Sequence, residues 1–395
     1  MASSSLQRAK TAPLTISLDM RQVEKSTGFS ALIAPHIQNA KALYIRRVSS
    51  IKGLTQTLPN FPQSMPNLRS LMLFHAVVRS NEDWSTDPFG PSIPALTSLS
   101  LISIPLYPAF LRLRTLTNLS LRNFRFNLHL DTLLDFLEEN HSLESLTLYI
   151  DFTQTAFRSS QRRVPIRNRL QILIIYSTNA MDCNALISNI ALKSGAHLGV
   201  TIHDHTTGPD ILPSIISMAH LSNLKSPTQM DYLPEGMGVR LLGPNGSFSF
   251  EALSLDDPFA RLPPTYLIDV RTFQYNRAEA ASSLKPIVFS PSSLPALEKL
   301  VVYREVTISR LLSPLFSDPS SSPSLKILAF VDCDLNKDFM EELTLFASNR
   351  KSTTSAWLYR VVIASSKGII PRFSLIDALG KYVPVDVRIG RLGIS

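Results

Sequence analysis

The sequence predicts an α/β solenoid, because one short leucine pattern recurs along the 395-residue chain with helical segments between its copies. In the stretch NLRSLMLF, Asn67–Phe74, leucines occupy the first, fourth and sixth places after Asn67, at Leu68, Leu71 and Leu73. The first-place leucines at 68, 96, 116, 143 and 170 are 28, 20, 27 and 27 residues apart. Two later copies open at Leu297 and Leu325, and this spacing is typical of leucine-rich repeats.

Each copy of the pattern predicts one β-strand. The fourth and sixth places alternate with small or polar residues, which is the two-residue period of a strand with one buried face. The residues between them should therefore point away from the core. Apart from the six seventh-place residues considered below, they are Ser70, Met72, Ser98, Ser100, Asn118, Ser120, Ser145, Thr147, Ile172, Ile174, Lys299 and Val301.

The segments between the strands carry helical patterns. They are Asp131–Asn140, Asp182–Ser194, Ile308–Phe316 and Asp338–Ala347. Asp182 is expected to cap the second helix, and Gly195 lies just past its end. Repeated strand and helix units build a curved parallel sheet, with strands on the concave face and helices on the convex face.

We expect one solenoid over residues 1–395, divided by the regularity of its repeats. Residues 1–60 form a strand–helix cap, 61–205 the regular repeats, 206–276 an irregular middle, and 277–395 the C-terminal repeats and cap. The middle contains a helical pattern, ILPSIISMAHL, and a β-hairpin near residues 239–250 that turns at Asn245-Gly246. A late copy of the pattern at Leu358 and a closing strand in VDVRIGRLGI complete the array.

Composition indicates a folded, mildly basic protein, with 44% hydrophobic residues and a net charge of +8. The two cysteines are too few for a disulfide framework and favour a reducing compartment. Neither a signal peptide nor a membrane-spanning run is evident, so we expect a cytoplasmic or nuclear protein without membrane contact.

One dense basic cluster is interpreted as a solvated loop, with an anion or partner site as the alternative. It comprises Arg158, Arg162, Arg163, Arg167 and Arg169. No aromatic side chain lies between Arg158 and Arg169, so the stacking platforms of single-stranded nucleic-acid sites are missing. Nucleic acid is therefore an unlikely partner.

The seventh place of the pattern supplies the candidate partner-binding residues. They are Phe74, Ile102, Arg122, Tyr149, Tyr176 and Tyr303. Aromatic residues and arginine dominate the energetics of protein interfaces, so the three tyrosines are candidate anchors and Arg122 a candidate contact for an acidic group. Alternatively, adjoining loops cover this column or it packs between strands.

No pattern in the sequence supports catalysis, a metal site or a cofactor. Asp332, Asp334, Asn336 and Asp338 alternate as in a calcium loop, but Lys337 occupies the position that needs glycine. We instead expect Asp338 to cap the next helix, with Glu341 completing a capping box. His203-Asp204-His205, with Cys183 and His197, matches no common zinc spacing. GPNGS lacks the Lys-Ser or Lys-Thr of a phosphate loop.

The chain resembles the leucine-rich-repeat portion of fungal F-box proteins, the basidiomycete type in particular. The resemblance rests on LQRAKTAPLTISLDM, ALIAPHIQNAKALYI, FPQSMPNLRSLML, IPALTSLSL and GPNGSFSFEAL. It implies a substrate-receptor domain of a cullin–RING ubiquitin ligase. The F-box that would dock the ligase adaptor is expected before Leu14, and no such segment precedes it, so adaptor binding is expected only if an F-box is restored.

The function expected from these observations is non-catalytic protein–protein recognition on the concave face, serving ubiquitin-ligase substrate selection by resemblance. The protein target is unknown. The alternatives are a stand-alone leucine-rich-repeat module that grips an anionic partner through residues 158–169, an enzyme without a nominated nucleophile, and a degenerate family member.

Overall fold

The computed structural model describes most of the repeat strands and the segments that adjoin them. The described residues are 12–23, 36–37, 39–48, 65–75, 95–104, 113–125, 130–151, 164–165, 169–177, 183, 186–193, 195–202, 226–232, 238–244, 246–252, 262, 264–276, 289–305, 308–352, 357–368 and 370–390. The chain forms two compact units, residues 1–193 (unit 1) and 194–395 (unit 2). Each is described by itself.

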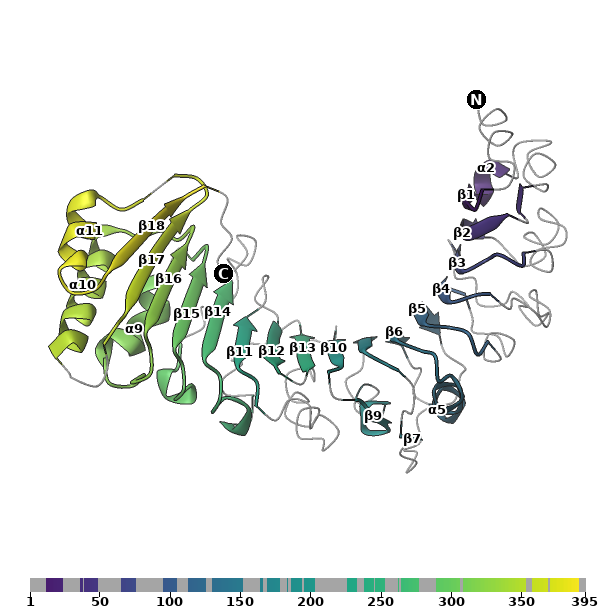
Figure 1. The fold of residues 1–395 in the computed structure, drawn as a ribbon, viewed down its shortest axis with the longest axis horizontal. Coiled ribbons are helices and arrows are strands. Elements are labelled where there is room, and N and C mark those ends of the chain that lie inside the picture. The colour runs from purple at the N-terminus through teal and green to yellow at the C-terminus, as the bar shows by residue number, and fades with distance from the viewer. Residues whose placement is uncertain are drawn as a thin grey trace. The chain divides into compact units, whose positions relative to one another are not determined.

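Unit 1 is built around a parallel sheet with strand order β1-β2-β3-β4-β5-β6-β8 (Figure 1). The strands are β1 Leu14–Asp19, β2 Ala40–Val48, β3 Ser70–His75, β4 Ser98–Ile102, β5 Asn118–Arg125, β6 Ser145–Asp151 and β8 Ile172–Ser177. A four-residue helix, α2 Met20–Val23, follows β1, and α5 Leu130–Glu139 joins β5 to β6. Every neighbouring pair in the sheet is parallel, as crossover connections of this length require.

The leucine pattern forms the core of both units. Register pairs Leu71 with Leu99, Leu99 with Leu119, and so on through Leu146 and Leu173. The first-, fourth- and sixth-place side chains of all seven copies are no more than 2% exposed. Burial of each such side chain contributes about 1.5–3 kcal/mol, so the ladder is the main stabilising element of the repeats.

Unit 2 has a nine-strand arrangement whose order departs from the sequence: β10-β13-β12-β11-β14-β15-β16-β17-β18. The strands are β10 His197–Ile202, β11 Gln229–Tyr232, β12 Gly238–Gly243, β13 Gly246–Ala252, β14 Thr272–Asn276, β15 Lys299–Tyr303, β16 Ile327–Val331, β17 Arg360–Ser365 and β18 Val385–Ile389. Strand β12 is antiparallel to both its neighbours, while β13 is parallel to β10 and β11 is parallel to β14. Three strands are thus inserted in reverse sequence order.

Three helices lie on one face of the last strands of unit 2 (Figure 1). They are α9 Ile308–Ser317, α10 Lys337–Ser352 and α11 Phe373–Gly380, and two 3₁₀ turns, η4 Pro264–Tyr266 and η6 Pro291–Ser293, precede β14 and β15. Phe339 of α10 is fully buried and meets Phe330 of β16 edge to face at 5.3 Å between ring centroids. Aromatic packing of this kind fixes the helix on the sheet.

The same left-handed turn follows several strands. Ser103, Arg304 and Asp332 each occupy the first position after a strand and have φ angles of 56°, 53° and 52°. Their N–H groups donate to the carbonyls of Arg122, Val331 and Ala364 on the next strand, each at 2.8 Å. This conformation is uncommon for residues other than glycine. Its recurrence at the same repeat position shows that these repeats share one turn, which adds a backbone hydrogen bond between neighbouring strands beyond the end of each strand.

Most predicted elements are confirmed. The seven pattern strands, the hairpin, the late copy at β17 and the closing strand β18 are present, as are helices at 131–140, 308–316 and 338–347. The helix predicted at Asp182–Ser194 is wrong in its second half, because Ile190–Ala191 forms strand β9 and pairs with β7 at Val164–Pro165. The helical pattern ILPSIISMAHL lies outside the described residues.

The structure describes a leucine-rich-repeat solenoid fold in α/β form: mostly parallel strands, in repeat order apart from β11, β12 and β13, with a leucine ladder on one face and helices between strands. Whether the two units continue as one array stays a prediction. None of the helices in the described ranges is long and apolar enough to cross a membrane.

Candidate binding surface

The open face, meaning the strand face opposite the leucine ladder, carries the candidate residues in unit 1. Every predicted outward side chain of β3, β4, β5, β6 and β8 is half-buried or exposed, while its neighbours in the strand are buried. Serine, threonine and asparagine predominate in the first two rows of this face, for example Ser98, Asn118 and Thr147. The predicted alternation is therefore confirmed. The face combines rows of polar side chains with one column of larger side chains, which are the seventh-place residues.

That column brings three of the predicted residues into direct contact. The rings of Tyr149 on β6 and Tyr176 on β8 stack with centroids 4.0 Å apart and an interplanar angle of 10°. The guanidinium carbon of Arg122 on β5 lies 5.2 Å from the centroid of the Tyr149 ring. Stacking and cation–π contact hold the three side chains in one conformation, which lowers the entropy lost when a partner binds.

Phe74 and Ile102 extend the column toward the N-terminus. Register pairs Phe74 on β3 with Ile102 on β4, and Ile102 with Arg122. The opposite end of the seventh place is different: Tyr303 belongs to β15 in unit 2 and has other neighbours. The structure thus brings together the unit 1 members of the predicted column, whereas Tyr303 is described with unit 2.

Strand β2 adds a column member that the leucine pattern does not predict. Arg46 is exposed and pairs with Phe74 in register. Ala40, Leu43 and Ile45 occupy the first, fourth and sixth places and are fully buried. Residue 40 lies 28 residues before Leu68, so the repeat step was the available signal; alanine in place of the opening leucine concealed it.

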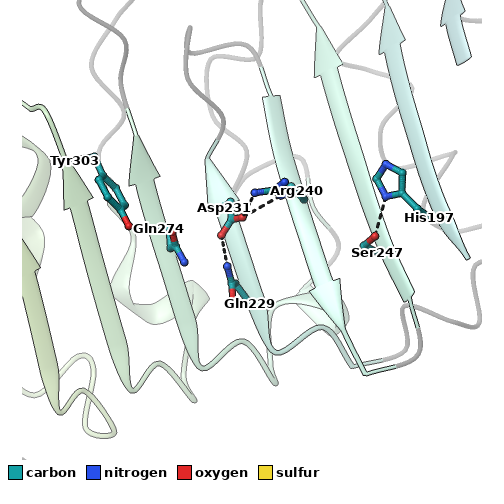
Figure 2. A network of polar contacts seen from close by, with 7 residues as sticks. All are labelled: His197, Gln229, Asp231, Arg240, Ser247, Gln274 and Tyr303. Atoms are coloured by element: carbon teal, nitrogen blue, oxygen red, sulfur yellow. Dashed lines mark hydrogen bonds and ion pairs between the residues drawn. The ribbon is translucent and has the colours of Figure 1, made fainter. Parts of the chain in front are cut away.

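The open face of unit 2 carries a polar network on the inserted strands (Figure 2). Asp231 of β11 is its centre. Its Oδ2 accepts hydrogen bonds from Nε and Nη2 of Arg240 at 3.0 and 2.7 Å, and its Oδ1 accepts one from Nε2 of Gln229 at 2.7 Å. The carboxylate side chain is 8% exposed and the arginine side chain 45%. A charge-assisted pair in this setting fixes the geometry more firmly than a surface ion pair does.

The antiparallel pairing of β11 and β12 explains this contact. Asp231 and Arg240 are directly opposite in register, so they share one face of the sheet. Opposite charges at such a position stabilise the pairing and its register. The sequence pattern does not predict this pair, because the pair depends on β11 lying next to β12, which the hairpin pattern alone does not reveal.

His197 connects the inserted strands to β10. Its Nδ1 lies 2.7 Å from Oγ of Ser247 on β13, the residue with which it pairs in register. Burial and, second, the positive charge of Arg240 lower the pKa of the His197 imidazole below 6.5. The ring is therefore neutral at neutral pH and is held by one hydroxyl group.

This pKa shift predicts a pH-dependent loss of stability. Below pH 6.5 the unfolded chain binds the His197 proton more tightly than the folded chain, so the free energy of unfolding falls as pH drops toward the lowered pKa. We expect His197→Gln to flatten this part of the profile between about pH 7.5 and 5 in urea unfolding. His141→Gln, at an exposed turn in unit 1, is the control. An unchanged profile in His197→Gln contradicts the prediction.

Tyr303 packs against an apolar cluster on the open face of β15–β17. The cluster consists of Val301, Ala329, Val331, Val362 and Ala364, all buried. Val301 was predicted to face outward; it does lie on the open face but is only 1% exposed, because the last strands are apolar on both faces. Burial and the negative charge of Asp231 raise the pKa of the Tyr303 phenol. Its hydroxyl lies 3.4 Å from Oε1 of Gln274, a long hydrogen bond.

The residues of the calcium-like sequence have structural roles. Both carboxylate oxygens of Asp332 accept hydrogen bonds from Oγ of Ser366, at 2.9 Å each, and Oδ1 also accepts from its N–H. Asn336, not Asp338, caps α10: its Oδ1 accepts from the N–H of Phe339 at 2.9 Å. The predicted cap was wrong by two residues, because the helix begins at Lys337.

Cys333 lies at the ninth position of the repeat that opens at Leu325, where leucine-rich repeats usually carry asparagine or cysteine. Its Sγ lies 3.3 Å from the carbonyl oxygen of Val302 in the preceding strand. Burial raises the pKa of its thiol to about 12. The thiol is therefore a protonated structural donor at neutral pH and a poor nucleophile.

The structure describes only part of the remaining candidate sites. Arg169 is exposed, and Arg158, Arg162, Arg163 and Arg167 lie outside the described residues, as do His203, Asp204 and His205. Within the described ranges, no three histidine, cysteine or acidic side chains are grouped as metal ligands.

Comparisons with known proteins find similarity among solved structures alone. No protein-family model matches the chain, and no curated protein does. Among solved structures, a leucine-rich-repeat protein of Leptospira interrogans is 14% identical, with 98% of each chain covered and a TM-score of 0.36. The leucine-rich-repeat fold is therefore assigned from the strand order, the register and the leucine ladder of the chain itself.

Proposed function

We propose that this protein is a non-catalytic recognition module, and that the open face of unit 1 binds a protein partner. The observation that carries the proposal is the stacked column of Arg122, Tyr149 and Tyr176. Large side chains on a solvent-facing sheet surface, already held against one another, are what a protein interface uses as anchors. The polar rows beside the column supply hydroxyl and amide groups for a hydrogen-bonding rim.

The column also has the chemistry to select an acidic partner. Arg122 keeps its guanidinium on the exposed side of the sheet, stacked over Tyr149. An arginine ordered in this way can donate two parallel hydrogen bonds to a carboxylate with little further loss of entropy. We therefore propose a target segment that places an acidic side chain next to an apolar one.

By resemblance to fungal F-box proteins, we propose that recognition serves substrate selection for a ubiquitin ligase, in the cytoplasm or nucleus. In that role the module would hold its target while a separate enzyme modifies it. This finer proposal rests on the sequence resemblance, and the adaptor is a partner only where an F-box accompanies the chain.

The test is affinity purification of the tagged chain from its own cells, followed by binding measurements with the recovered partner. We expect Tyr149→Ala with Tyr176→Ala to weaken binding strongly, since loss of one anchor typically costs about 2 kcal/mol. Phe373→Ala, at a side chain 73% exposed on α11, is the matched control for loss of an aromatic. Circular dichroism confirms that each variant folds.

The outcomes separate the coarse proposal from the fine one. If the folded double variant binds the partner as tightly as the parent does, the column of Arg122, Tyr149 and Tyr176 is not the binding site. Recovery of a cullin–RING adaptor together with the partner supports ligase targeting. Recovery of a specific partner without the adaptor supports a stand-alone module and argues against the ubiquitin role.

A further inference from the structure

A groove of about 720 Å³ lies at the edge of unit 2 where three successive strands begin. Residues just before β16, β17 and β18 form it, together with the ends of α10 and α11. Its lining combines three aromatic residues, Trp357, Tyr359 and Tyr382, with three lysines, Lys326, Lys351 and Lys381. We call it the aromatic–lysine groove. The volume is within the range of ligand-binding pockets, about 300–1,000 Å³.

The aromatic side chains are unusually exposed. Trp357 is 55% exposed, Tyr359 71% and Tyr382 38%, although all three are large enough to contribute to a core. Beneath them, Leu358 and Val383 are buried. A cluster of exposed aromatic residues around a concavity marks an interaction site far more often than scattered surface residues do.

Backbone hydrogen bonds join the strands at the base of the groove. The N–H of Tyr359 donates to the carbonyl of Lys326 at 2.8 Å, and the N–H of Val361 donates to the carbonyl of Pro384 at 2.9 Å. Adjacent strand entries are thus tied together by backbone hydrogen bonds. A ligand would therefore meet a pre-formed surface, which limits the entropy cost of binding.

The charge of the groove is positive. Among the lining residues that the structure describes, none has an acidic side chain. Lys326 is partly neutralised by Glu298, with Nζ 3.5 Å from Oε1. Nζ of Lys351 donates to the carbonyl of Lys381 at 3.0 Å and lies 5.9 Å from the centroid of the Tyr382 ring, so this cationic group is placed beside an aromatic face. Lys381 adds an exposed ammonium group.

We propose that the aromatic–lysine groove binds an acidic peptide segment of a partner protein, with an apolar side chain of the segment placed between Trp357 and Tyr359. Carboxylates on either side would face Lys351 and Lys381. A peptide is favoured over single-stranded nucleic acid because the three lysines surround one concavity. A nucleic-acid site needs cations along an extended track for several successive phosphates.

The first experiment uses Trp357 as the reporter. The chain has two tryptophans, so Trp84→Phe in the full-length protein leaves Trp357 as the sole source of tryptophan emission. The probe is the synthetic peptide Asp-Glu-Phe-Asp-Glu, and its neutral counterpart is Asn-Gln-Phe-Asn-Gln. We expect a saturable change in Trp357 emission with the acidic peptide and binding about tenfold weaker with the neutral one.

Matched variants test the contacts. Lys381→Ala should weaken binding of the acidic peptide several-fold. Lys337→Ala should leave it unchanged, because Lys337 is 72% exposed and lies at the start of α10, whereas the groove is at the end of this helix. Tyr359→Ala should weaken both peptides, and Leu345→Ala, on α10 and 63% exposed, neither. These substitutions are at exposed positions, so folding is expected to survive and is checked by circular dichroism.

Three results would overturn the proposal: no saturable change with either peptide, equal affinity for the acidic and neutral peptides, or tighter binding of oligothymidylate than of the acidic peptide. The last would assign the groove to nucleic acid. The double variant at Tyr149 and Tyr176 should bind the probe peptide normally, so failure here is distinguishable from failure of the recognition surface in unit 1.

Discussion

Replacing Arg350 with methionine is expected to lower the free energy of unfolding of unit 2 by about 3–5 kcal/mol. The side chain is fully buried near the end of α10. Its guanidinium donates to three carbonyl oxygens in the turn that precedes β16: Pro319 at 2.9 Å, Ser322 at 3.0 Å and Leu325 at 2.9 Å. Methionine keeps most of the volume but removes the arginine donor from all three carbonyls, and those of Ser322 and Leu325 belong to buried residues. Leaving a buried acceptor without a donor is the costly half of losing a hydrogen bond.

The guanidinium keeps its charge in this position. Burial lowers the pKa of Arg350 to about 10, still well above neutral pH. The ring of Phe346, one helical turn earlier, lies 5.5 Å from the guanidinium carbon and offers a partial counterpart to the charge. The arginine therefore connects a helix to the turn of the preceding repeat through charge-assisted bonds.

Urea unfolding with Trp357 as the reporter, in the Trp84→Phe background, measures the effect. Arg310→Met, at an exposed position on α9, is the control and should change the free energy of unfolding by no more than about 0.5 kcal/mol. Equal changes in the two variants would show that the three carbonyl contacts do not stabilise unit 2.

Phe248→Ala is expected to destabilise unit 2 by about 3–5 kcal/mol, by leaving a cavity in the core of the inserted hairpin. Phe248 and Phe250 of β13 are both fully buried, with ring centroids 6.4 Å apart. The cavity would lie at the junction of β13 with β10 and β12, since Phe248 pairs with Leu198 on one side and Leu241 on the other.

Ser249→Ala is the matched control, because Ser249 lies between the two phenylalanines on the open face of the same strand. Its free energy of unfolding should stay close to that of the parent. A small effect of Phe248→Ala, comparable to that of Ser249→Ala, would mean that the alternation of β13 does not define the core there. The measurement is the same urea titration.

The repeat strands could be predicted from the sequence because the leucine period and the strand period agree. Leu146 and Leu148, for example, specify the position, face and register of β6 at once. The pairing of Tyr149 with Tyr176 followed from the same reasoning, since residues at one repeat position are neighbours when successive strands are parallel and in register. Arg122 lies where the register of β5 and β6 shifts, so its contact with Tyr149 does not follow from the register alone. The stacking of the two tyrosine rings could not be predicted, because it depends on the side-chain rotamers and the repeat pattern does not specify them.

The predictions that were wrong or incomplete depend on non-local contacts. Ile190–Ala191 has a helical pattern around it, yet it pairs with Val164–Pro165 more than twenty residues earlier. Tyr303 occupies the same repeat position as Tyr176, but its surroundings are set by Gln274 and the apolar cluster of the neighbouring strands. Asp231 and Arg240 meet only because the inserted strands reverse the sequence order.

That reversed order has a consequence for synthesis on the ribosome. In a regular solenoid each strand can dock on the one made just before it, so structure grows in the direction of translation. Strand β10 waits unusually long for its next neighbour, because β13 pairs with it only up to Ala252, fifty residues after Ile202, and the strands made in between do not pair with it. Strands β12 and β13, separated by a short turn, can pair at once at little loop-closure entropy. The emerging chain therefore carries an unpaired strand edge until this hairpin arrives, and this interval is when a chaperone would be most useful to it.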